Sequence, residues 1–248
     1  MVITLYQQDI VWGDAEANRR RVEEQINAVP KSDIFVVPET FTTGFGDHMA
    51  ALAEEQEGPT LQWARRMAKE HDLLFVGTWI VRDGDKVYNR LHWVYPDGEF
   101  GTYDKGHTFR VSGEADQIAR GTRREVFEWR GWRIKPAICY DLRFPKWLRN
   151  GVAGPNLALQ YDLLLVCSNW PGSRHEAWTT LLKARAIENM CYVVGCNRAG
   201  VDGAGIPYSG DSAIIDFKGF VMDGFTATLD KEKLNTFRQH WPFYLDFD

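Results

Sequence analysis

Short apolar runs in this chain alternate with longer segments in which apolar residues return every three or four positions. The short runs predict β-strands and the periodic segments predict helices. After Asp14, a suitable N-cap, Val22, Ile26 and Val29 fall on one helical face. The first part of the chain therefore predicts a strand at 2–9, a helix at 15–29, a strand at 34–38 and a helix at 60–72.

The remaining chain predicts hairpins, a buried strand and a third long helix. Residues 73–81 and 86–95 are joined by Asp83-Gly84-Asp85, a favourable hairpin turn. Further elements are expected at 99–103, 125–139 (a hairpin around Gly131), 161–169, 174–190 (the helix), 191–199, 208–217 and, as a last turn and strand, 218–224. The early alternation indicates βαβ units and the α/β class. No linker or repeat interrupts it, so we expect one domain over residues 1–248.

Composition narrows the class of protein. The 248 residues are 44% hydrophobic and 25% charged, which is typical of a globular protein. With 34 acidic and 29 basic residues the net charge is −5, so nucleic acid is not expected as a main partner. No apolar run approaches the roughly 20 residues that span a bilayer, and the first residues read as a strand and not as a secretion signal. We therefore expect no membrane association and a cytoplasmic location.

The cysteines and histidines lack the spacing of metal sites. No two of the four cysteines form a CxxC pair, and Cys167, Cys191 and Cys196 lie in apolar runs, where we expect them to be buried. His107 and His175 show neither HExxH spacing nor a carboxylate cluster. No glycine pattern of a nucleotide-binding loop follows a strand. The sequence thus predicts neither a metal nor another cofactor.

Polar or reactive side chains follow several predicted strands. Glu39, Lys105, Cys139 and Asn169 each come after such a strand, and in open α/β sheets ligand sites gather at the carboxyl ends of strands. Cys139 lies where a strand turns toward a helix, and backbone N–H groups at such a turn lower a thiol pKa and bind an oxyanion. Structural interpretations stay open for each residue: a buried thiol, a carboxylate that caps a turn and a surface lysine.

The segments around three of these residues favour a catalytic interpretation. VVPETFTTGF contains Glu39, YDKGHTFR contains Lys105 and ICYDLRFP contains Cys139. In this order they resemble the signature segments of the nitrilase superfamily of carbon–nitrogen hydrolases, which carry a Glu-Lys-Cys triad. The stretch from 168 to 200 is also similar to that family, so the resemblance covers essentially the whole chain. Within the superfamily the chain is most similar to bacterial ω-amidases, which hydrolyse dicarboxylic acid monoamides such as α-ketoglutaramate.

This resemblance implies a nitrilase-like four-layer αββα sandwich and a homodimer. The predicted helix at 174–190 is apolar around most of its circumference, which fits burial at an interface or, alternatively, in the core. Its apolar positions are Trp178, Leu181, Leu182, Ile187 and Met190.

The resemblance also implies roles for the triad. Cys139 is expected to be the nucleophile, and Glu39 to take the thiol proton and return it to the departing ammonia. Lys105 and the backbone N–H of Tyr140 are expected to stabilise the oxyanion of the tetrahedral intermediate.

A second glutamate of the family matches Glu114 best, with the role of orienting Lys105 and the substrate. The alternative for Glu114 is a solvated carboxylate in a loop. Glu176 is its rival, but Ser173 and Glu176 have the spacing of a capping box, so we expect Glu176 to be structural.

A dicarboxylic monoamide carries a distal carboxylate, which suits the bidentate guanidinium of arginine. Arg110 and Arg174 are near triad segments and are the candidates, with a surface role as the alternative for each. Arg143 is expected to pair with an acidic neighbour. Trp170 and Phe45 are expected to form walls of the pocket. The expected partner is therefore a small amide.

Three other functions stay open. A nitrilase would apply the same triad to a C≡N group, and an N-carbamoyl amide hydrolase would apply it to a carbamoyl group. A non-catalytic homologue would only bind a partner, but all members of the triad are present, which argues against this third function.

Overall fold

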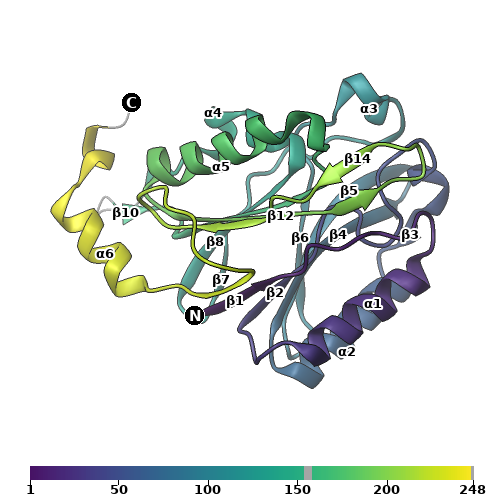
Figure 1. Ribbon diagram of the computed structural model, residues 1–248, viewed down its shortest axis with the longest axis horizontal. Coiled ribbons are helices and arrows are strands. Elements are labelled where there is room, and N and C mark those ends of the chain that lie inside the picture. Colours follow the sequence, from purple (N-terminus) through teal and green to yellow (C-terminus); the bar gives the residue numbers. More distant parts are fainter. Residues whose placement is uncertain (154–157, 247–248) are drawn as a thin grey trace.

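The computed structural model describes residues 1–153 and 158–246 and contains two large β-sheets that face each other (Figure 1). The first sheet has the order β16-β1-β2-β4-β5-β6, with β3 paired to β4, and the second has the order β15-β12-β11-β8-β7. The strands of the first sheet are β1 (Val2–Leu5), β2 (Ile34–Val36), β3 (Glu54–Glu55), β4 (Leu74–Asp83), β5 (Lys86–Val94), β6 (Phe100–Asp104) and β16 (Thr226–Thr228). Those of the second are β7 (Phe127–Trp129), β8 (Trp132–Ile138), β11 (Leu163–Ser168), β12 (Tyr192–Asn197) and β15 (Ala213–Ile215).

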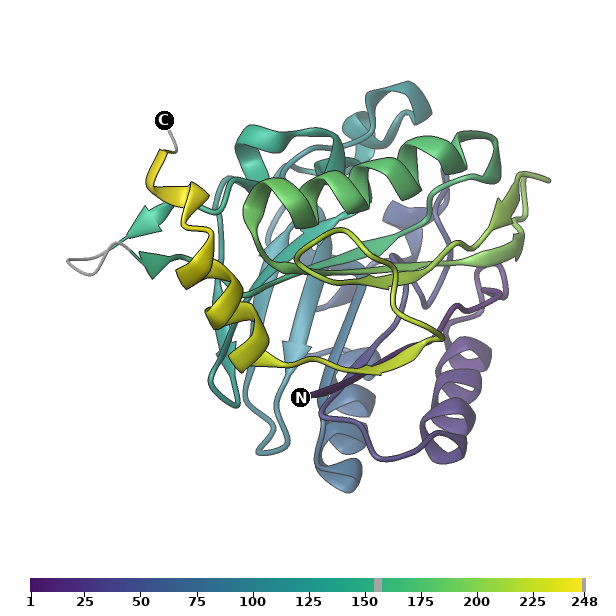
Figure 2. The same cartoon turned by 60° about the vertical axis from the view of Figure 1, so that its left-hand side comes forward.

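Helices cover the outer face of each sheet. α1 (Ala15–Ala28) and α2 (Pro59–His71) lie on one side of the molecule and α5 (His175–Asn189) on the other, with both sheets between them (Figures 1 and 2). The arrangement is the predicted four-layer αββα sandwich. Within each sheet the central pairs β1–β2–β4 and β8–β11–β12 are parallel, so their carboxyl ends share one edge.

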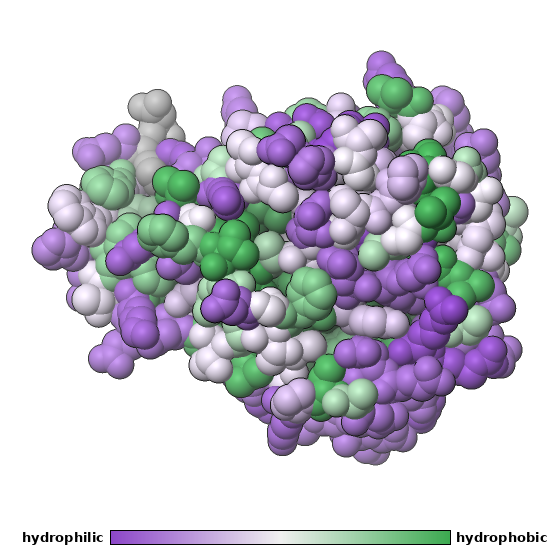
Figure 3. All heavy atoms as spheres, viewed as in Figure 1, coloured by the Kyte–Doolittle hydropathy of each residue, from purple (hydrophilic) through white to green (hydrophobic). Residues whose placement is uncertain are grey.

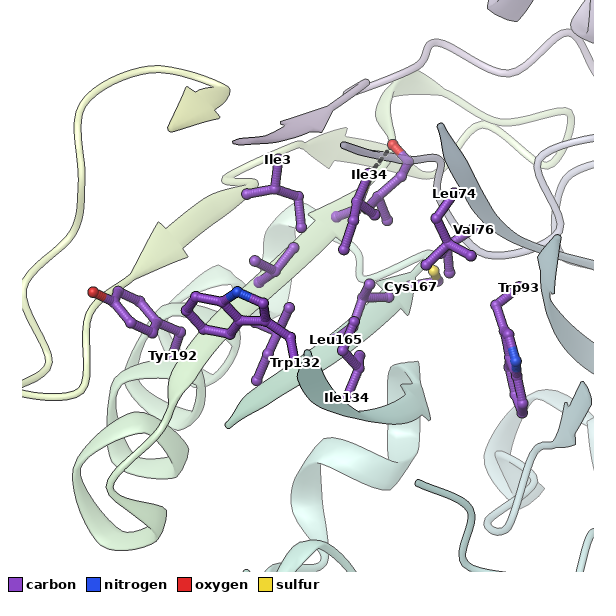
Figure 4. Packing of buried hydrophobic residues seen from close by; sticks show 14 of the residues in the cluster. Ile3, Ile34, Leu74, Val76, Trp93, Trp132, Ile134, Leu165, Cys167 and Tyr192 are labelled. Atoms are coloured by element: carbon purple, nitrogen blue, oxygen red, sulfur yellow. Dashed lines mark hydrogen bonds between the residues drawn. The ribbon is translucent and has the colours of Figure 1, made fainter. Parts of the chain in front are cut away.

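Three apolar clusters hold the layers together. The central cluster lies between the sheets, with Ile34 and Val76 from the first facing Ile134 and Leu165 from the second (Figure 4). A second cluster joins the first sheet to α1 and α2, and a third joins the second sheet to α5. Strands covered on both faces are apolar at nearly every position. For this reason the continuous run in β11 is fully buried, and the predicted burial of Cys167, Cys191 and Cys196 is confirmed.

The first helix follows the sequence pattern closely. Asp14 Oδ1 accepts the backbone N–H of Ala17 at 2.9 Å, so the predicted N-cap is confirmed. Val22 and Ile26 are buried against the first sheet. The outward side of α1 and α2 is charged, and Figure 3 shows this part of the surface, at the lower right, as mostly hydrophilic.

The predicted hairpin of β4 and β5 is also present. The two strands pair antiparallel up to Asp83 and Lys86, and Gly84 between them takes a φ of +58°, a left-handed value that favours glycine.

The predictions at both ends of the chain are less accurate. The first strand ends at Leu5 and not at residue 9. Near the C-terminus the chain forms β16 and α6 (Lys231–His240), neither of which the pattern predicted. β16 is a three-residue Thr-Ala-Thr segment that pairs with β1, so its strand conformation comes from a distant partner. α6 buries little more than Leu234 and Arg238, too few residues for a clear apolar stripe.

The predicted capping box at the start of α5 is wrong. The N-cap residue is Arg174, without a side-chain capping bond, because Ser173 already belongs to a 3-10 turn, η4 (Gly172–Arg174). Glu176 is exposed and lies 3.6 Å from His175. Its expected structural role as a cap is therefore not realised.

Most of the apolar circumference of α5 is accounted for within the chain. Trp178, Leu182 and Met190 are buried in the cluster under this helix or at its end, whereas Ile187 is 57% exposed. A homodimer stays a prediction. Among residues 1–153 and 158–246, no helix combines the length and apolarity needed to cross a membrane.

Candidate active site

Strands of both sheets end at one edge of the sandwich, and their ends bring the predicted triad together. Glu39 and Lys105 follow β2 and β6 of the first sheet, and Cys139 and Asn169 follow β8 and β11 of the second. Lys105 Nζ lies 2.8 Å from Glu39 Oε1, the Asn169 N–H donates to Glu39 Oε2 at 2.8 Å, and Cys139 Sγ lies 3.9 Å from the Asn169 carbonyl oxygen. The site therefore exists only where the two sheets pack together.

Lys105 lies between two carboxylates out of contact with solvent. Its Nζ is 2.8 Å from Glu39 Oε1 and 2.9 Å from both oxygens of Glu114, and all three side chains are 0% exposed. Burial alone would lower the pKa of Lys105, but the charges of Glu114 and Glu39 raise it above its ordinary value, so the ammonium stays charged. Burial raises the pKa of Glu114, against the opposing effect of Lys105. The predicted contact between Glu114 and Lys105 is thus present in the structure.

Neighbouring polar groups fix Glu39. Asn169 Nδ2 donates to the Glu39 carbonyl and to Thr40 Oγ1, and the Thr40 N–H donates to Thr78 Oγ1 at 2.7 Å. Thr40 has a φ of +44°, which turns the chain directly after Glu39. Asn89 Nδ2, from the middle of β5, donates to Glu39 Oε1 at 2.8 Å. Sequence reasoning missed Asn89; its one signal is a polar residue within a strand that is buried on both sides.

Cys139 lies at the expected junction of strand and helix. β8 ends at Ile138 and a 3-10 helix, η3 (Cys139–Arg143), begins at Cys139 with a φ of +43°. Such strained positions cluster at functional sites. Burial, together with the charge of Glu39, raises the pKa of the Cys139 thiol above its ordinary range despite Lys105. The expected lowering of this pKa is therefore wrong. A thiol with a raised pKa needs a base before it can act as a nucleophile.

Asp141 joins the segment that follows β6 to the segment that follows β8. Its Oδ1 accepts the backbone N–H and the ring Nδ1 of His107 at 2.9 and 2.8 Å, and its Oδ2 accepts the Tyr103 hydroxyl at 2.7 Å and the Ile138 N–H at 3.1 Å. A carboxylate only accepts, so His107 Nδ1 carries the proton in this contact. The segment that holds Lys105 is therefore tied to the segment that holds Cys139.

Cys139 and Lys105 line a cavity of about 480 Å³. That volume suits a small ligand. Tyr140, Trp170 and Phe45 line the same cavity, as expected, and the Phe45 ring centre lies 5.0 Å from Lys105 Nζ.

Of the three arginines, Arg174 agrees with the expectation, whereas Arg110 and Arg143 differ from it. Arg174 lines the cavity, with its guanidinium 5.4 Å from the Phe109 ring centre. Arg110 is exposed on η2 (Arg110–Ser112) and is not among the lining residues, so its placement in the pocket is wrong. Arg143 makes no ion pair within the described part of the chain. Its guanidinium lies over the Trp170 ring at 4.8 Å, and it lines the cavity too. The short η3 helix places Arg143 on the cavity side.

Sequence reasoning also missed one wall of the cavity, which Trp12 forms with His48. The Trp12 ring approaches the backbone so closely that a Cβ on Gly203 would lie 2.5 Å from it and one on Gly46 would lie 2.7 Å from it. Glycine at these positions was the available signal, because such close approach excludes any side chain.

The relatives of this chain match it over nearly its whole length. The family model described as carbon–nitrogen hydrolase matches residues 2–236. Omega-amidase YafV of Yersinia enterocolitica is 42% identical over 99% of this chain and 96% of its own length, and the 2-oxoglutaramate amidase of Bacillus subtilis is 34% identical over 89% and 84%. The crystal structure of XC1258 from Xanthomonas campestris, a CN-hydrolase superfamily protein, is 41% identical with a TM-score of 0.96 and covers 100% of this chain and 97% of its own. The resemblance to this family is confirmed: the chain belongs to the carbon–nitrogen hydrolases and is an enzyme that hydrolyses amide C–N bonds.

Proposed function

We propose that the enzyme hydrolyses small dicarboxylic acid monoamides, such as α-ketoglutaramate or α-ketosuccinamate, to the acid and ammonia. The observation that carries this proposal is the buried cluster of Glu39, Lys105 and Glu114 beside the Cys139 thiol, at a cavity that arginines also line. The names of the ω-amidase and 2-oxoglutaramate amidase relatives support the same substrate class.

In the first half of the reaction, Cys139 Sγ adds to the amide carbon while Glu39 takes the thiol proton. This transfer belongs to the step because the thiol is protonated in the free enzyme. Lys105 and the Tyr140 N–H stabilise the oxyanion. Lysine has three donors, and two of them satisfy its carboxylate partners. Glu39 then protonates the leaving nitrogen and the C–N bond breaks. Ammonia departs, and the acyl group remains on Cys139 as a thioester.

In the second half, Glu39 takes a proton from water as the water oxygen adds to the thioester carbon. The C–S bond breaks, the sulfur recovers the proton, and the acid is released. Glu114 holds Lys105 in place and supports its charge in both halves. No step of this scheme requires a metal or another cofactor.

The distal carboxylate of the substrate binds to Arg174, with Arg143 as a second donor. Both guanidiniums line the cavity, and neither is paired with a carboxylate of the described residues. The Trp170 indole N–H donates to the Arg174 carbonyl at 2.8 Å and its ring lies under Arg143, so one side chain supports both arginines. Asp202 also lines the cavity, but its carboxylate already accepts hydrogen bonds from the Tyr208 hydroxyl and two backbone N–H groups, so it is not a partner of these arginines.

The test is ammonia release from α-ketoglutaramate by the wild type and by Cys139→Ala, with a simple nitrile and an N-carbamoyl amino acid in parallel. We expect release from the keto-amide that disappears in the variant, whose melting temperature should match that of the wild type. Hydrolysis that persists in Cys139→Ala would exclude the thioester route. Faster turnover of the nitrile or the carbamoyl compound would replace the proposed substrate class.

A further inference from the structure

Asn89 contacts every charged member of the buried cluster. Its Nδ2 donates to Glu39 Oε1 at 2.8 Å and to Glu114 Oε1 at 3.3 Å. Its backbone carbonyl accepts the Lys105 N–H at 3.0 Å. Because Lys105 Nζ donates to the same two carboxylate oxygens, the two nitrogens and two oxygens form a closed ring of hydrogen bonds.

The amide of Asn89 acts only as a donor. It is 0% exposed, and its Oδ1 has no hydrogen-bond partner within the described residues. The reverse orientation of the amide would place this oxygen against two carboxylates, so the ring dictates which way it points. A buried carbonyl without a partner is unfavourable for stability. Its presence here indicates that the two N–H groups are needed as donors to Glu39 and Glu114.

We propose that Asn89 is a positioning residue that keeps Glu39 ionised and in place as the proton acceptor for Cys139. Its bond to Glu39 is 0.5 Å shorter than its bond to Glu114 (2.8 against 3.3 Å), so the amide favours the charged form of Glu39 more strongly. The inference rests on the proposed function, in which Glu39 takes the thiol proton.

The geometry predicts the direction in which loss of the Asn89 amide changes the ionisation of Glu39. The Asn89 amide donates to the charged carboxylate of Glu39, so removing the amide makes this charged form less stable. The titratable groups that contact this carboxylate or share its cluster are Lys105, Glu114 and Cys139. All three residues are retained when Asn89 is replaced, and the amide lies closer to Glu39 than to Glu114, so a shift of the acid limb of a pH profile reports mainly on the bond to Glu39.

The experiment compares wild type with Asn89→Leu, which keeps the branching and the number of side-chain heavy atoms but has no donor. The readouts are the pH profile of kcat/KM for α-ketoglutaramate and the pH profile of Cys139 alkylation by iodoacetamide, followed by peptide mass spectrometry. We expect the acid limb of both profiles to move up by about one pH unit, with kcat lowered and KM little changed. Asn89→Ser retains one donor, so its limb should lie between those of the other two proteins.

Asn150→Leu is the matched control. Asn150 is equally buried, and its Nδ2 donates to two carbonyls at 2.9 Å outside the site, so this variant should lose thermal stability without moving the limb. An unchanged limb in folded Asn89→Leu, or an equal shift in Asn150→Leu, overturns the proposal. If Asn89→Leu does not fold, an unchanged limb in Asn89→Ser overturns it. Alkylation needs no substrate, so a limb shift in an enzyme that does not act on monoamides would refute the proposed function alone.

Discussion

Individual side chains in this site carry charge that only their neighbours make tolerable. Lys105 has no contact with water and is held by Glu39 and Glu114, so its removal would leave two buried carboxylates without an opposite charge. The arginines of the cavity are the opposite case, because they are exposed and unpaired within the described chain and so available to a ligand.

This contrast gives a prediction for substrate recognition. Arg174→Met should raise KM for α-ketoglutaramate by about 10- to 100-fold, since a hydrogen-bonded charge pair is worth roughly 1.5–3 kcal/mol. Turnover of a neutral amide such as butyramide should barely change. Arg110→Met is the control, because Arg110 lies outside the cavity, and it should match the wild type on both substrates. Equal losses on the charged and the neutral amide would contradict the role of Arg174.

At the scale of elements, the proposed nucleophile Cys139 depends on a single 3-10 helix, which begins at this strained residue. Four donors converge on Asp141, from β6, from the loop after it and from the end of β8, and they fix η3 against that loop. The backbone of Cys139, at a φ of +43°, is stable only while its surroundings impose it.

Asp141→Asn keeps the shape of the side chain but replaces one acceptor by a donor. We expect the free energy of unfolding to fall by about 1–3 kcal/mol. We also expect kcat per folded molecule to fall by about 10- to 100-fold, because a small displacement of catalytic groups is costly. Thermal melting would measure the first effect, and ammonia release per active site, counted by alkylation of Cys139, would measure the second. Asp116→Asn, at an exposed position of α3 (Glu114–Gln117), should alter neither. A loss of stability with full turnover would show that Asp141 supports only the fold.

The same elements show which parts of the site could be predicted from the sequence. Glu39, Lys105 and Cys139 are identified by motifs that stand at the ends of strands, and both strand ends and motifs are local properties. Asn89 belongs to no such motif, because its importance comes from hydrogen bonds to Glu39 and Glu114, which lie elsewhere in the sequence. The rise in the Cys139 pKa was equally hidden, since it depends on burial and on the charge of Glu39, which follows a strand of the other sheet.

At the scale of the whole molecule, a second buried charge cluster ties α6 to the second sheet, at the start of β11 and so at the opposite end from the site. Asp162 is 0% exposed and pairs with Arg238 at 2.7 Å, with Arg133 at 2.9 Å and with Lys231 at 3.1 Å. Burial alone would raise the pKa of Asp162, but hydrogen bonds from Arg133 and the charge of Arg238 lower it to about 2. The C-terminal helix is thus held by a group that stays ionised at neutral pH.

Because the pKa of Asp162 is lower in the folded than in the unfolded chain, its stabilisation is complete above about pH 4 and is lost as the pH falls toward 2. The ionised Asp162 thus contributes roughly 2 kcal/mol to the free energy of unfolding at neutral pH. Urea unfolding of the wild type should show that loss between pH 4 and 2. Asp162→Asn should be less stable at pH 7 and show a smaller loss over the same range. Parallel pH profiles for the two proteins would contradict the assignment.

The pairing of β1 with β16 has a consequence for how the protein is made. Val2 lies opposite Thr228, so β1 is paired along this side by residues that are synthesised more than two hundred positions later. Until they emerge, β1 presents unpaired N–H and C=O groups, which is the kind of edge that recruits other chains. Nascent chains that stall before residue 226 should therefore depend on chaperones more than the finished protein does.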